Sequence, residues 1–278
     1  MQEAPKTIGS VASFVDAVSE LRRKWRRKWE SGNDAEWIPW FRGEGDCDKT
    51  SRLCPVLYRP RRAMEDLLHE EQELRLEFRR CGGQLVSERQ PVDKWEWYFL
   101  MRHYGVPTRL LDWTDGCLVA LYFAVANHDS RKPPDAAVYM LDPWWLNEEV
   151  FSHLQVSENE RPEGVALSDW PQAQPYLPNE LDSENLGPIL PLAIDPSHLS
   201  RRVAAQRSRF TIFGQNRNGL INLSEKANAK IYRFRIRAAT RRTIETDLRT
   251  CGISESTIFP DLEGFGRELH AIWKRRIN

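Results

Sequence analysis

The sequence predicts an α+β fold in which small mixed or antiparallel sheets are flanked by helices. Three observations support this prediction. Apolar residues recur at helical spacing near the N-terminus, short apolar runs resemble strands towards the C-terminus, and an almost wholly apolar helix is expected in the middle. At 278 residues and 41% hydrophobic content, the chain can fill one large core. We expect a main domain over residues 37–278 and an N-terminal basic amphipathic helix, within residues 1–36, packed on it.

Helices are predicted where apolar side chains repeat every three to four residues. Ser10 can cap a helix over residues 11–30, whose second half is basic. Residues 117–125 are apolar on nearly every side, so their helix is expected to be buried, with Asp115 as its cap. Three further segments have a helical pattern: residues 63–80, 93–101 and 240–251.

Strands are predicted in short runs rich in apolar and β-branched residues. The last run, residues 230–237, alternates apolar side chains with arginines, which is typical of a strand with one face in solvent. Residues 143–190 show no sustained period and are expected to form a long acidic loop insertion, either a flap or a partner-binding surface. The other expected strands are residues 37–42, 108–113, 136–141, 189–194 and 210–213.

Charge is segregated along the chain, although the formal total is zero. Residues 143–200 hold ten acidic residues against one basic residue (net −9), and residues 201–242 hold twelve basic residues against one acidic residue (net +11). These segments can be solvated faces that balance each other, or a surface that attracts a polyanion such as RNA, DNA or a dinucleotide. In the second interpretation, the expected substrate contacts are Arg207, Arg209, Arg233 and Arg235.

Several classes of protein are disfavoured by composition. The five cysteines are odd in number and never spaced as CxxC, which argues against a disulfide framework and a structural zinc site. No metal is therefore expected. The chain lacks a long apolar run and a signal-like N-terminal pattern, so we expect a cytoplasmic protein without a membrane partner.

Polar residues stand at the mouth of the predicted buried helix. Arg109, Asp112 and Thr114 interrupt an apolar run just before it, and Arg42 ends an aromatic run against Gly43. A buried arginine needs an anionic partner, which can be internal or a ligand, because an unpaired buried guanidinium is costly. Gly43 permits the close backbone approach that phosphate sites commonly require.

Four ordered motifs in this chain resemble the FRG domain family, which is named for its Phe-Arg-Gly. The resemblance extends from Trp37 to about Leu269 and informs the fold more than the mechanism. The motifs are WFRGE at residues 40–44, HYGVPTRLLDWT at 103–114 with ALYFA at 120–124, AQRSRFTIFG at 205–214, and IFPDLEG at 258–264.

A second, weaker resemblance is to NAD-dependent ADP-ribosyltransferases, and it implies their core fold. Arg42 stands on an early strand, Asp112 to Thr114 take the place of the Ser-Thr-Ser motif, and residues 120–124 match the following helix. Gln206 stands about where that superfamily has its catalytic glutamate, and Glu225 and Glu263 are candidates without a clear place.

The second resemblance implies NAD as co-substrate and an enzyme that modifies RNA, DNA or protein. The FRG resemblance suggests that this enzyme is of the toxin or defence kind, with a possible neutralising partner protein. Breaking the nicotinamide–ribose bond develops positive charge on the sugar, so the site must fix the diphosphate and the ribose hydroxyls. The implied catalytic residues are Arg42, Asp112, Thr114 and Gln206. The implied cofactor-binding residues are Arg42, Gly43, Tyr104, Arg109, Trp113 and Tyr122.

Other interpretations stay open at this point. Gln206 in place of a glutamate favours a catalytically inactive module that binds NAD or nucleic acid. Asp112 can serve only to neutralise Arg42 or Arg109 inside the fold. His103 and the basic surface would suit a nuclease, but His103 also suits a histidine near the core.

Overall fold

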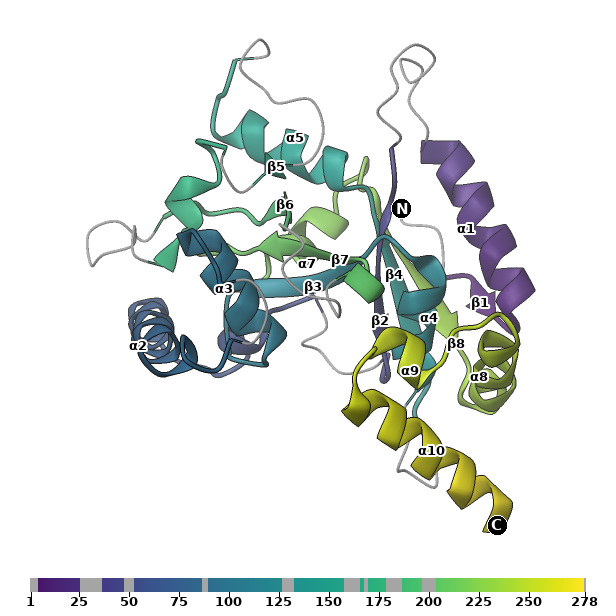
Figure 1. The fold of residues 1–278 in the computed structure, drawn as a ribbon. Helices are drawn as coiled ribbons and strands as arrows, with labels where there is room; N and C mark the ends of the chain where they lie inside the picture. Colours follow the sequence, from purple (N-terminus) through teal and green to yellow (C-terminus); the bar gives the residue numbers. More distant parts are fainter. Residues whose placement is uncertain are drawn as a thin grey trace.

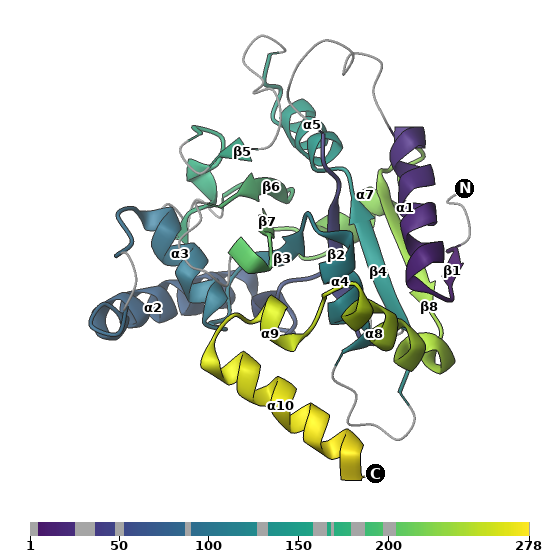
Figure 2. The same ribbon diagram turned by 45° about the vertical axis from the view of Figure 1, so that its right-hand side comes forward.

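One mostly antiparallel sheet organises the chain (Figures 1 and 2). The computed structural model describes residues 5–25, 37–47, 53–86, 90–126, 133–157, 166–167, 170–178, 187–196 and 204–277. Within these ranges eight strands form a sheet in the order β1-β8-β4-β2-β3-β7-β6-β5, and the outermost pairs β1–β8 and β5–β6 are parallel. The predicted α+β class is confirmed at this level.

The strands are β1 (Thr7–Ile8), β2 (Trp40–Glu44), β3 (Leu110–Thr114), β4 (Ala136–Leu141), β5 (Ala166–Leu167), β6 (Leu192–Asp195), β7 (Ser208–Ile212) and β8 (Ile231–Ile236). All of them except β1 and β5 lie close to segments that the sequence predicts as strands, and β5 lies in the predicted loop insertion. The α-helices are α1 (Val11–Trp25), α2 (Met64–Gly82), α3 (Lys94–His103), α4 (Cys117–Val125), α5 (Pro143–His153), α7 (Gly219–Ser224), α8 (Arg241–Thr250), α9 (Glu255–Ile258) and α10 (Leu262–Ile277). Short 3-10 turns are η2 (Val56–Tyr58), η4 (Gln174–Tyr176) and η6 (Ala238–Thr240).

All six residues of β4 are buried. Because alternate side chains of a strand point to opposite sides of the sheet, both faces of the sheet are covered at β4. Val138 and its alternate neighbours pack with α1, α4 and α8, whereas Tyr139 and its alternate neighbours pack in a second core. On the adjacent β8, Phe234 and Ile236 are buried while Arg233 and Arg235 are exposed, as the alternating sequence predicts.

Helix α4 lies directly against β2, and small residues make this contact possible. A Cβ atom at Gly43 would lie 2.0 Å from the carbonyl oxygen of Ala120 and 2.6 Å from the backbone nitrogen of Ala124. Only glycine fits there without moving the helix. The sequence suggested that Gly43 lets a phosphate approach the backbone closely. In the structure it is the backbone of α4 that approaches Gly43.

The N-terminal helix packs on the core as predicted. The Oγ atom of Ser10 accepts a hydrogen bond from the backbone nitrogen of Ser13 (3.1 Å), which caps α1. Phe14, Val18 and their helical neighbours are buried against the core that contains α4. The rest of the predicted helix, beyond Trp25, lies outside the described residues.

The prediction of a structureless acidic insertion is wrong for residues 143–153, which form α5. The Asp142 carboxylate caps this helix, and Pro143 occupies its first turn. Asn147 interrupts the apolar spacing by which a helix is recognised, because it is polar although it is buried. Its side-chain amide donates to the carbonyl of Ala193 (3.0 Å) and accepts from the backbone nitrogen of Ala193 (2.8 Å). These two hydrogen bonds attach α5 to the backbone of β6.

Other parts of the insertion also belong to the core. Tyr176 and Leu177 are buried in a third apolar cluster that includes residues of α3, α5 and β7. Residues 158–165, 168–169 and 179–186 of the predicted insertion lie outside the described residues. Within the described ranges, no helix combines the length and the apolar character that a membrane crossing needs.

Candidate functional site

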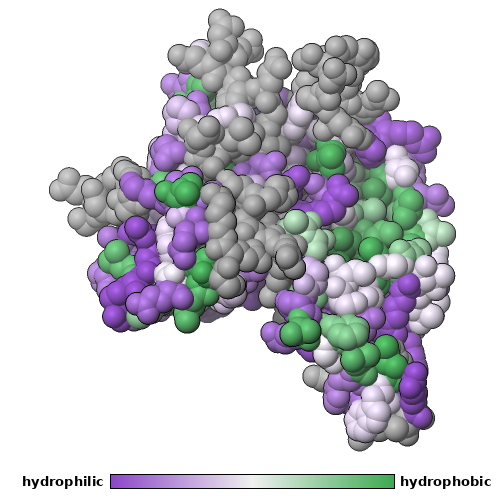
Figure 3. Space-filling view, in the orientation of Figure 1, coloured by the Kyte–Doolittle hydropathy of each residue, from purple (hydrophilic) through white to green (hydrophobic). Residues whose placement is uncertain are grey.

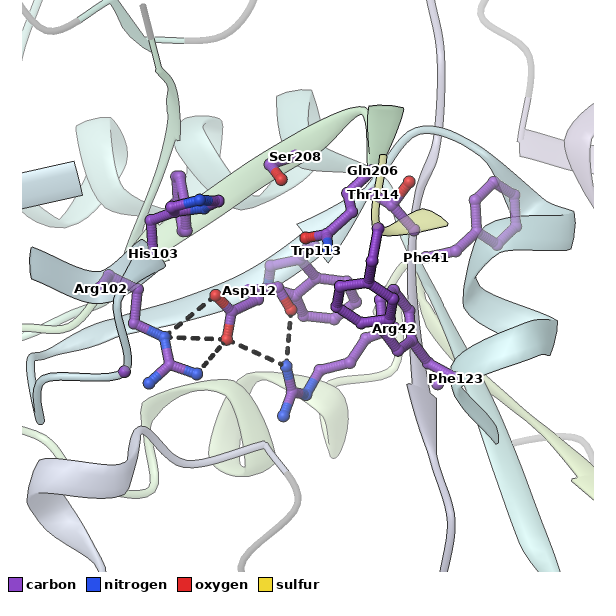
Figure 4. A pocket seen from close by; sticks show the side chains of 14 residues that line it. Phe41, Arg42, Arg102, His103, Asp112, Trp113, Thr114, Phe123, Gln206 and Ser208 are labelled. Atoms are coloured by element: carbon purple, nitrogen blue, oxygen red, sulfur yellow. Dashed lines mark hydrogen bonds and ion pairs between the residues drawn. The ribbon is translucent and has the colours of Figure 1, made fainter. Parts of the chain in front are cut away.

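A cleft of about 380 Å³ lies beside the weakest junction of the sheet (Figure 4). A single residue pair, Phe41 with Thr114, joins β2 to β3, whereas β2 pairs with β4 and β3 with β7 over five residues each. The cleft is lined by Phe41, Arg42, Gly43, Arg102, His103, Gly105, Asp112, Trp113, Thr114, Phe123, Gln206, Ser208, Phe210 and Phe259. All four residues predicted to be catalytic are in this set.

Arg42 is held in a fixed orientation at the cleft. Its Nη1 atom donates to the carbonyl oxygen of Asp112 (2.7 Å), and its Nε and Nη2 atoms lie 2.8 and 2.7 Å from Oε1 of Glu44. Nη1 is also 3.8 Å from Oδ2 of Asp112. The contacts with Asp112 join β2 to β3 beyond their single ladder pair, and the contacts with Glu44 fix the guanidinium in the wall of the cleft.

Asp112 is the centre of the charged network in Figure 4. The Nε atom of Arg102, near the end of α3, lies 3.0 Å from both carboxylate oxygens of Asp112, and Nη2 of Arg102 donates to Oδ2. Burial alone would raise the pKa of Asp112, but the charges of Arg102 and Arg42 outweigh it and hold the pKa below its usual value. Asp112 therefore stays ionised near neutral pH.

Gln206 reaches the cleft on the segment before β7, and Asp115 anchors this segment. The backbone nitrogen of Asp115 donates to the carbonyl of Arg207 (3.3 Å). Its carboxylate pairs with the side chain of Arg207 and with Nη2 of Arg209 (2.8 Å). Arg207 has a φ of 49°, in the left-handed region that residues other than glycine seldom adopt.

The predicted role of Asp115 as the cap of α4 is wrong. The cap position is Gly116, and no side chain caps it. Thr114 instead accepts a hydrogen bond at its Oγ1 atom from the backbone nitrogen of Gly116 (3.0 Å), which fixes the turn between β3 and α4. The Thr114 hydroxyl thus lies at the cleft with its orientation set by the turn.

Arg109 was expected to bind the cofactor, but the structure places it in the interior and outside the cleft lining. The side chain is 0% exposed, and Nε of Arg109 lies 2.7 Å from Oε2 of the equally buried Glu71. Nη1 donates to the carbonyl of Phe213 (3.0 Å), and Nη2 donates to the carbonyl of Tyr176. Its guanidinium connects the start of β3 to α2, to η4 and to the residue that follows β7.

The predicted aromatic cofactor contacts fall in three different places. Tyr104 is 66% exposed and Tyr122 is buried with its hydroxyl bonded to Glu255, and neither lines the cleft. Trp113 does line it, although its indole nitrogen donates to Oγ1 of Thr211 (3.1 Å) and its ring belongs to a core cluster. Aromatic residues that the sequence interpretation did not assign also line the cleft: Phe123, Phe210 and Phe259.

The arginines predicted to bind substrate are mostly paired with carboxylates. In addition to its bond with Asp115, Arg209 lies 3.1 Å from Oδ1 of Asp195, and Arg235 lies 2.7 Å from Oδ2 of Asp135. Arg233 is exposed on β8. Among the described residues, part of the positive charge of segment 201–242 is therefore neutralised by ion pairs within the fold.

Neither Glu225 nor Glu263, the two candidates for a catalytic glutamate in the sequence, lines the cleft. Glu225 follows α7, and Glu263 pairs with Arg267 on α10. In the part of the chain that the structure describes, no group of three or more His, Cys, Asp or Glu side chains is arranged to hold a metal ion.

Comparison with known families supports one of the two resemblances. Residues 38–133 match the family model of the FRG domain. No curated protein and no solved structure shows significant similarity to the chain. The resemblance to ADP-ribosyltransferases, and with it their core fold, is therefore not supported by the comparisons.

The FRG match covers one wall of the cleft. It includes Arg42, Arg102, Asp112 and Thr114, and the contact between Gly43 and α4. Gln206 and the other lining residues from 208 onwards, which include Ser208 and Phe210 on the neighbouring strand β7, lie outside the matched segment. The FRG segment thus supplies the charged wall, and later parts of the chain complete the cleft.

Arg102 is a site residue that sequence reasoning missed. It stands on α3, whose other members Trp95, Tyr98 and Met101 are buried, and its basic side chain resembled an ordinary solvated position. One signal was available. Asp112 interrupts an apolar strand and needs a cation, and Arg102 lies in the last turn of the helix that precedes that strand.

Proposed function

We propose that the cleft binds NAD and that the protein is an NAD-dependent ADP-ribosyltransferase. The observation that carries this proposal is the convergence of Arg42, Asp112, Thr114 and Gln206 on one cleft. These residues come from β2, β3 and the segment before β7. The folding of the chain alone does not require such polar side chains to lie together. They supply the charge and hydroxyl chemistry that a dinucleotide needs.

The charged side of the cleft suits a diphosphate. Arg102 uses Nε and Nη2 on Asp112, and its Nη1 atom has no partner among the described residues. Charge-assisted hydrogen bonds from a guanidinium to phosphate oxygens are among the stronger polar contacts in proteins. Arg42 adds a second positive charge beside it, in a position fixed by Glu44.

The remaining lining suits a nucleoside. The hydroxyls of Thr114 and Ser208 and the amide of Gln206 can hold ribose hydroxyls, and Phe123 and Phe259 offer rings on which a nicotinamide can stack. Cleavage of the nicotinamide–ribose bond develops positive charge on the sugar. The ionised Asp112 carboxylate would stabilise that charge by proximity.

A specific observation favours a second candidate, a module that binds NAD without turning it over. Among the described lining residues the carboxylate is Asp112, and two arginines already neutralise it. Gln206 cannot ionise. In this alternative the cleft retains affinity for the dinucleotide but lacks a group to activate the acceptor.

For the acceptor we propose a nucleic acid, RNA before DNA, or a protein. The basic surface that favours RNA is smaller than the sequence suggests, because Arg207, Arg209 and Arg235 pair with carboxylates. We further propose that the protein acts in the cytoplasm as a toxin or defence effector with a neutralising partner protein, so that its expression alone slows growth.

The test compares the purified protein with two variants, Arg102→Met at the cleft and Arg80→Met on the exposed surface of α2 as a matched control. Each is incubated with NAD labelled in its adenylate part and with cellular RNA, DNA or protein, and nicotinamide release is measured in parallel.

We expect label transfer to one fraction for the wild type and the control, and at least a tenfold weaker reaction for Arg102→Met. Loss of a charge-assisted contact worth about 1.5–3 kcal/mol gives that factor or more. Tight NAD binding without nicotinamide release would favour the inactive module, and no NAD binding by calorimetry would reject both candidates.

A further inference from the structure

The C-terminal part of the chain places one aromatic side chain in the cleft. Phe259 follows α9 and lines the cleft together with Phe123 of α4. Figures 1 and 2 show α9 beside α4 in both views. The two ring centroids are 6.1 Å apart and the ring planes are perpendicular, at 90°, which is a preferred arrangement for an aromatic pair. We call these two rings the aromatic corner.

The backbone of Phe259 is fixed by the turn between α9 and α10. Its nitrogen donates to the carbonyl of Glu255 (2.8 Å), and its carbonyl accepts from the nitrogen of Asp261 (2.9 Å). Gly264 packs against the same carbonyl, since a Cβ atom there would lie 2.2 Å from its oxygen. Only glycine lets the first turn of α10 come this close. The point from which the Phe259 ring projects is therefore set by both helices.

Arg267 of α10 holds the ring itself. Its guanidinium carbon lies 4.9 Å from the centroid of the Phe259 ring, within the range of cation–π contacts. Two carboxylates orient the guanidinium: Nε lies 2.6 Å from Oε1 of Glu255, and Nη1 lies 2.6 Å from Oε1 of Glu263. The position of Arg267 over the ring is thus fixed by charge pairing.

These contacts continue into a closed circuit of five side chains. The hydroxyl of Tyr122 donates to Oε2 of Glu255, and the Tyr122 ring centroid lies 5.8 Å from that of Phe123. The circuit therefore runs from Phe123 to Phe259, Arg267, Glu255 and Tyr122 and back to Phe123. Because each member is held from two sides, the aromatic corner has its shape before any ligand enters the cleft, and such preorganisation favours binding.

The segment that carries Phe259 is acidic. Residues 255–268 contain four acidic residues, Glu255, Asp261, Glu263 and Glu268, against the single basic Arg267, which gives a net charge of −3. Both carboxylates and the faces of aromatic rings attract positive charge. A cationic planar ring is therefore favoured over a neutral one. The oxidised nicotinamide ring of NAD is cationic, whereas adenine and the reduced ring of NADH are neutral.

We propose that Arg267 is a positioning residue for the nicotinamide end of the ligand: it holds Phe259 in the aromatic corner, and the corner takes the cationic nicotinamide ring. This inference rests on the proposed function, because it requires that the cleft binds NAD. Arg267 acts through Phe259 and not by contact with the ligand. Both residues lie outside the FRG match of residues 38–133, so the preference for this ring comes from a later part of the chain.

The first test measures, by calorimetry, the affinity of the full chain for NAD, NADH and ADP-ribose, which lacks the nicotinamide ring. The variants are Phe259→Leu, Arg267→Gln and the double variant. Arg79→Gln is the matched control, because its guanidinium lies 5.8 Å from the centroid of the Trp97 ring and neither residue lines the cleft. Arg267 is 43% exposed, and Figure 3 shows hydrophobic and hydrophilic side chains side by side over α10, so its replacement leaves the core intact.

We expect the wild type and the control to bind NAD more tightly than NADH. Phe259→Leu and Arg267→Gln should each weaken NAD binding by about threefold or more and change ADP-ribose binding by less than about twofold. Removal of a positive charge would by itself favour a cationic ring, so a loss of NAD affinity in Arg267→Gln reports the position of Phe259. Arg267→Lys should restore the affinity, since it returns a cation to the ring.

The double variant separates action through Phe259 from an independent effect. It should bind NAD no more weakly than Phe259→Leu alone, because Arg267 has no ring left to position. Losses that add in the double variant, equal losses for NAD and ADP-ribose, or an unchanged NAD affinity in Arg267→Gln would each overturn the proposal. A wild type that binds NADH as tightly as NAD would overturn the assignment of the cationic ring to the corner.

The second test needs no ligand. Phenylalanine is replaced by 4-fluorophenylalanine throughout the chain, and the fluorine signals of Phe123 and Phe259 are assigned with single leucine variants. We expect Arg267→Gln to shift both signals and Arg79→Gln to shift neither. A shift at Phe259 alone would report only the lost charge, and an unmoved Phe123 signal would overturn the positioning role. If the wild type binds neither NAD nor ADP-ribose, the proposed function fails and the nicotinamide assignment with it, whereas the fluorine spectra still decide whether Arg267 positions Phe259.

Discussion

The buried cluster of Arg109, Glu71 and Tyr98 and the cleft cluster of Arg102, Asp112 and Arg42 are built from the same chemistry. Both pair arginine with a carboxylate, and both involve α3 and the start or middle of β3. They differ in closure. Arg109 is fully enclosed, with Nε, Nη1 and Nη2 all engaged inside the protein, whereas Asp112 is 40% exposed and Arg102 keeps Nη1 without a partner in the described chain.

This difference separates a structural role from a binding role. In the buried cluster the Tyr98 hydroxyl donates to Glu71, and the backbone nitrogen of Arg109 lies 2.7 Å from the same carboxylate, so no polar group is left for a ligand. Burial alone would lower the pKa of Arg109, but the negative charge of Glu71 outweighs it and raises the pKa. An arginine–carboxylate pair therefore indicates a binding site only when some of its hydrogen-bond donors remain free for a ligand.

The largest effect should come from breaking the closed cluster. Arg109→Met leaves the Glu71 carboxylate buried without its cation, which typically costs about 3–5 kcal/mol. We expect a loss of that size in the free energy of unfolding, measured by urea denaturation. The double variant Arg109→Met/Glu71→Leu should recover part of it, because the Glu71 carboxylate is then no longer buried without its cation. A loss below about 1 kcal/mol would show that the cluster is not closed.

A second effect tests whether the glycine beside Arg42 serves packing. Gly43→Ala places a methyl group 2.0 Å from the carbonyl oxygen of Ala120, so α4 must move away from β2. Overpacking of this kind costs about 1–3 kcal/mol. Gly9→Ala is the control, because its Cβ would meet nothing within 4 Å. Equal stability of Gly43→Ala and the wild type would contradict a packing role.

The sequence predicted the cleft better than it predicted the buried cluster, and the reason is distance along the chain. Asp112 and Thr114 lie two residues apart on one strand, and Arg42 ends an aromatic run, so local pattern identified all three. The partner of Arg109 is 38 residues upstream, on α2, whose many charges indicated a solvated helix. Local pattern does not show that Glu71 is its fully buried member.

Secondary structure was predictable where apolar period and capping agreed. Ser10 and Asp93 cap the helices that they were expected to start, since Asp93 accepts from the backbone nitrogen of Glu96 (2.7 Å). Helix α5 was missed because Asn147 occupies a buried position. Helix α10 was not predicted for two reasons. Its apolar side chains face outwards, and its sequence contains two glycines, which lower helix propensity.

A smaller effect on stability is expected at the open cluster. Arg102→Met removes the main partner of Asp112, but that carboxylate keeps water and Arg42 nearby, so we expect a loss of only about 1 kcal/mol in the free energy of unfolding. Ligand affinity should fall by tenfold or more in the same variant. A stability loss as large as that of Arg109→Met would mean that the cleft cluster is also structural.

The smallest effect is the pH dependence of the open cluster. Because the pKa of Asp112 is lowered in the folded state, the unfolded chain binds the proton more tightly, and stability from this group is present above its ordinary value of 3.8. It is lost as the pH falls through the lower, folded-state pKa. Asp112→Asn removes this titration, so the gap in unfolding free energy between wild type and variant should be steady near neutral pH and close below about pH 4. Comparing the two proteins cancels the contributions of other carboxylates with lowered pKa, such as Asp135 and Glu268. A gap that stays constant down to the acid transition would show that Asp112 is not held ionised by Arg102 and Arg42, and the distinction between the two clusters would then rest on free donors alone.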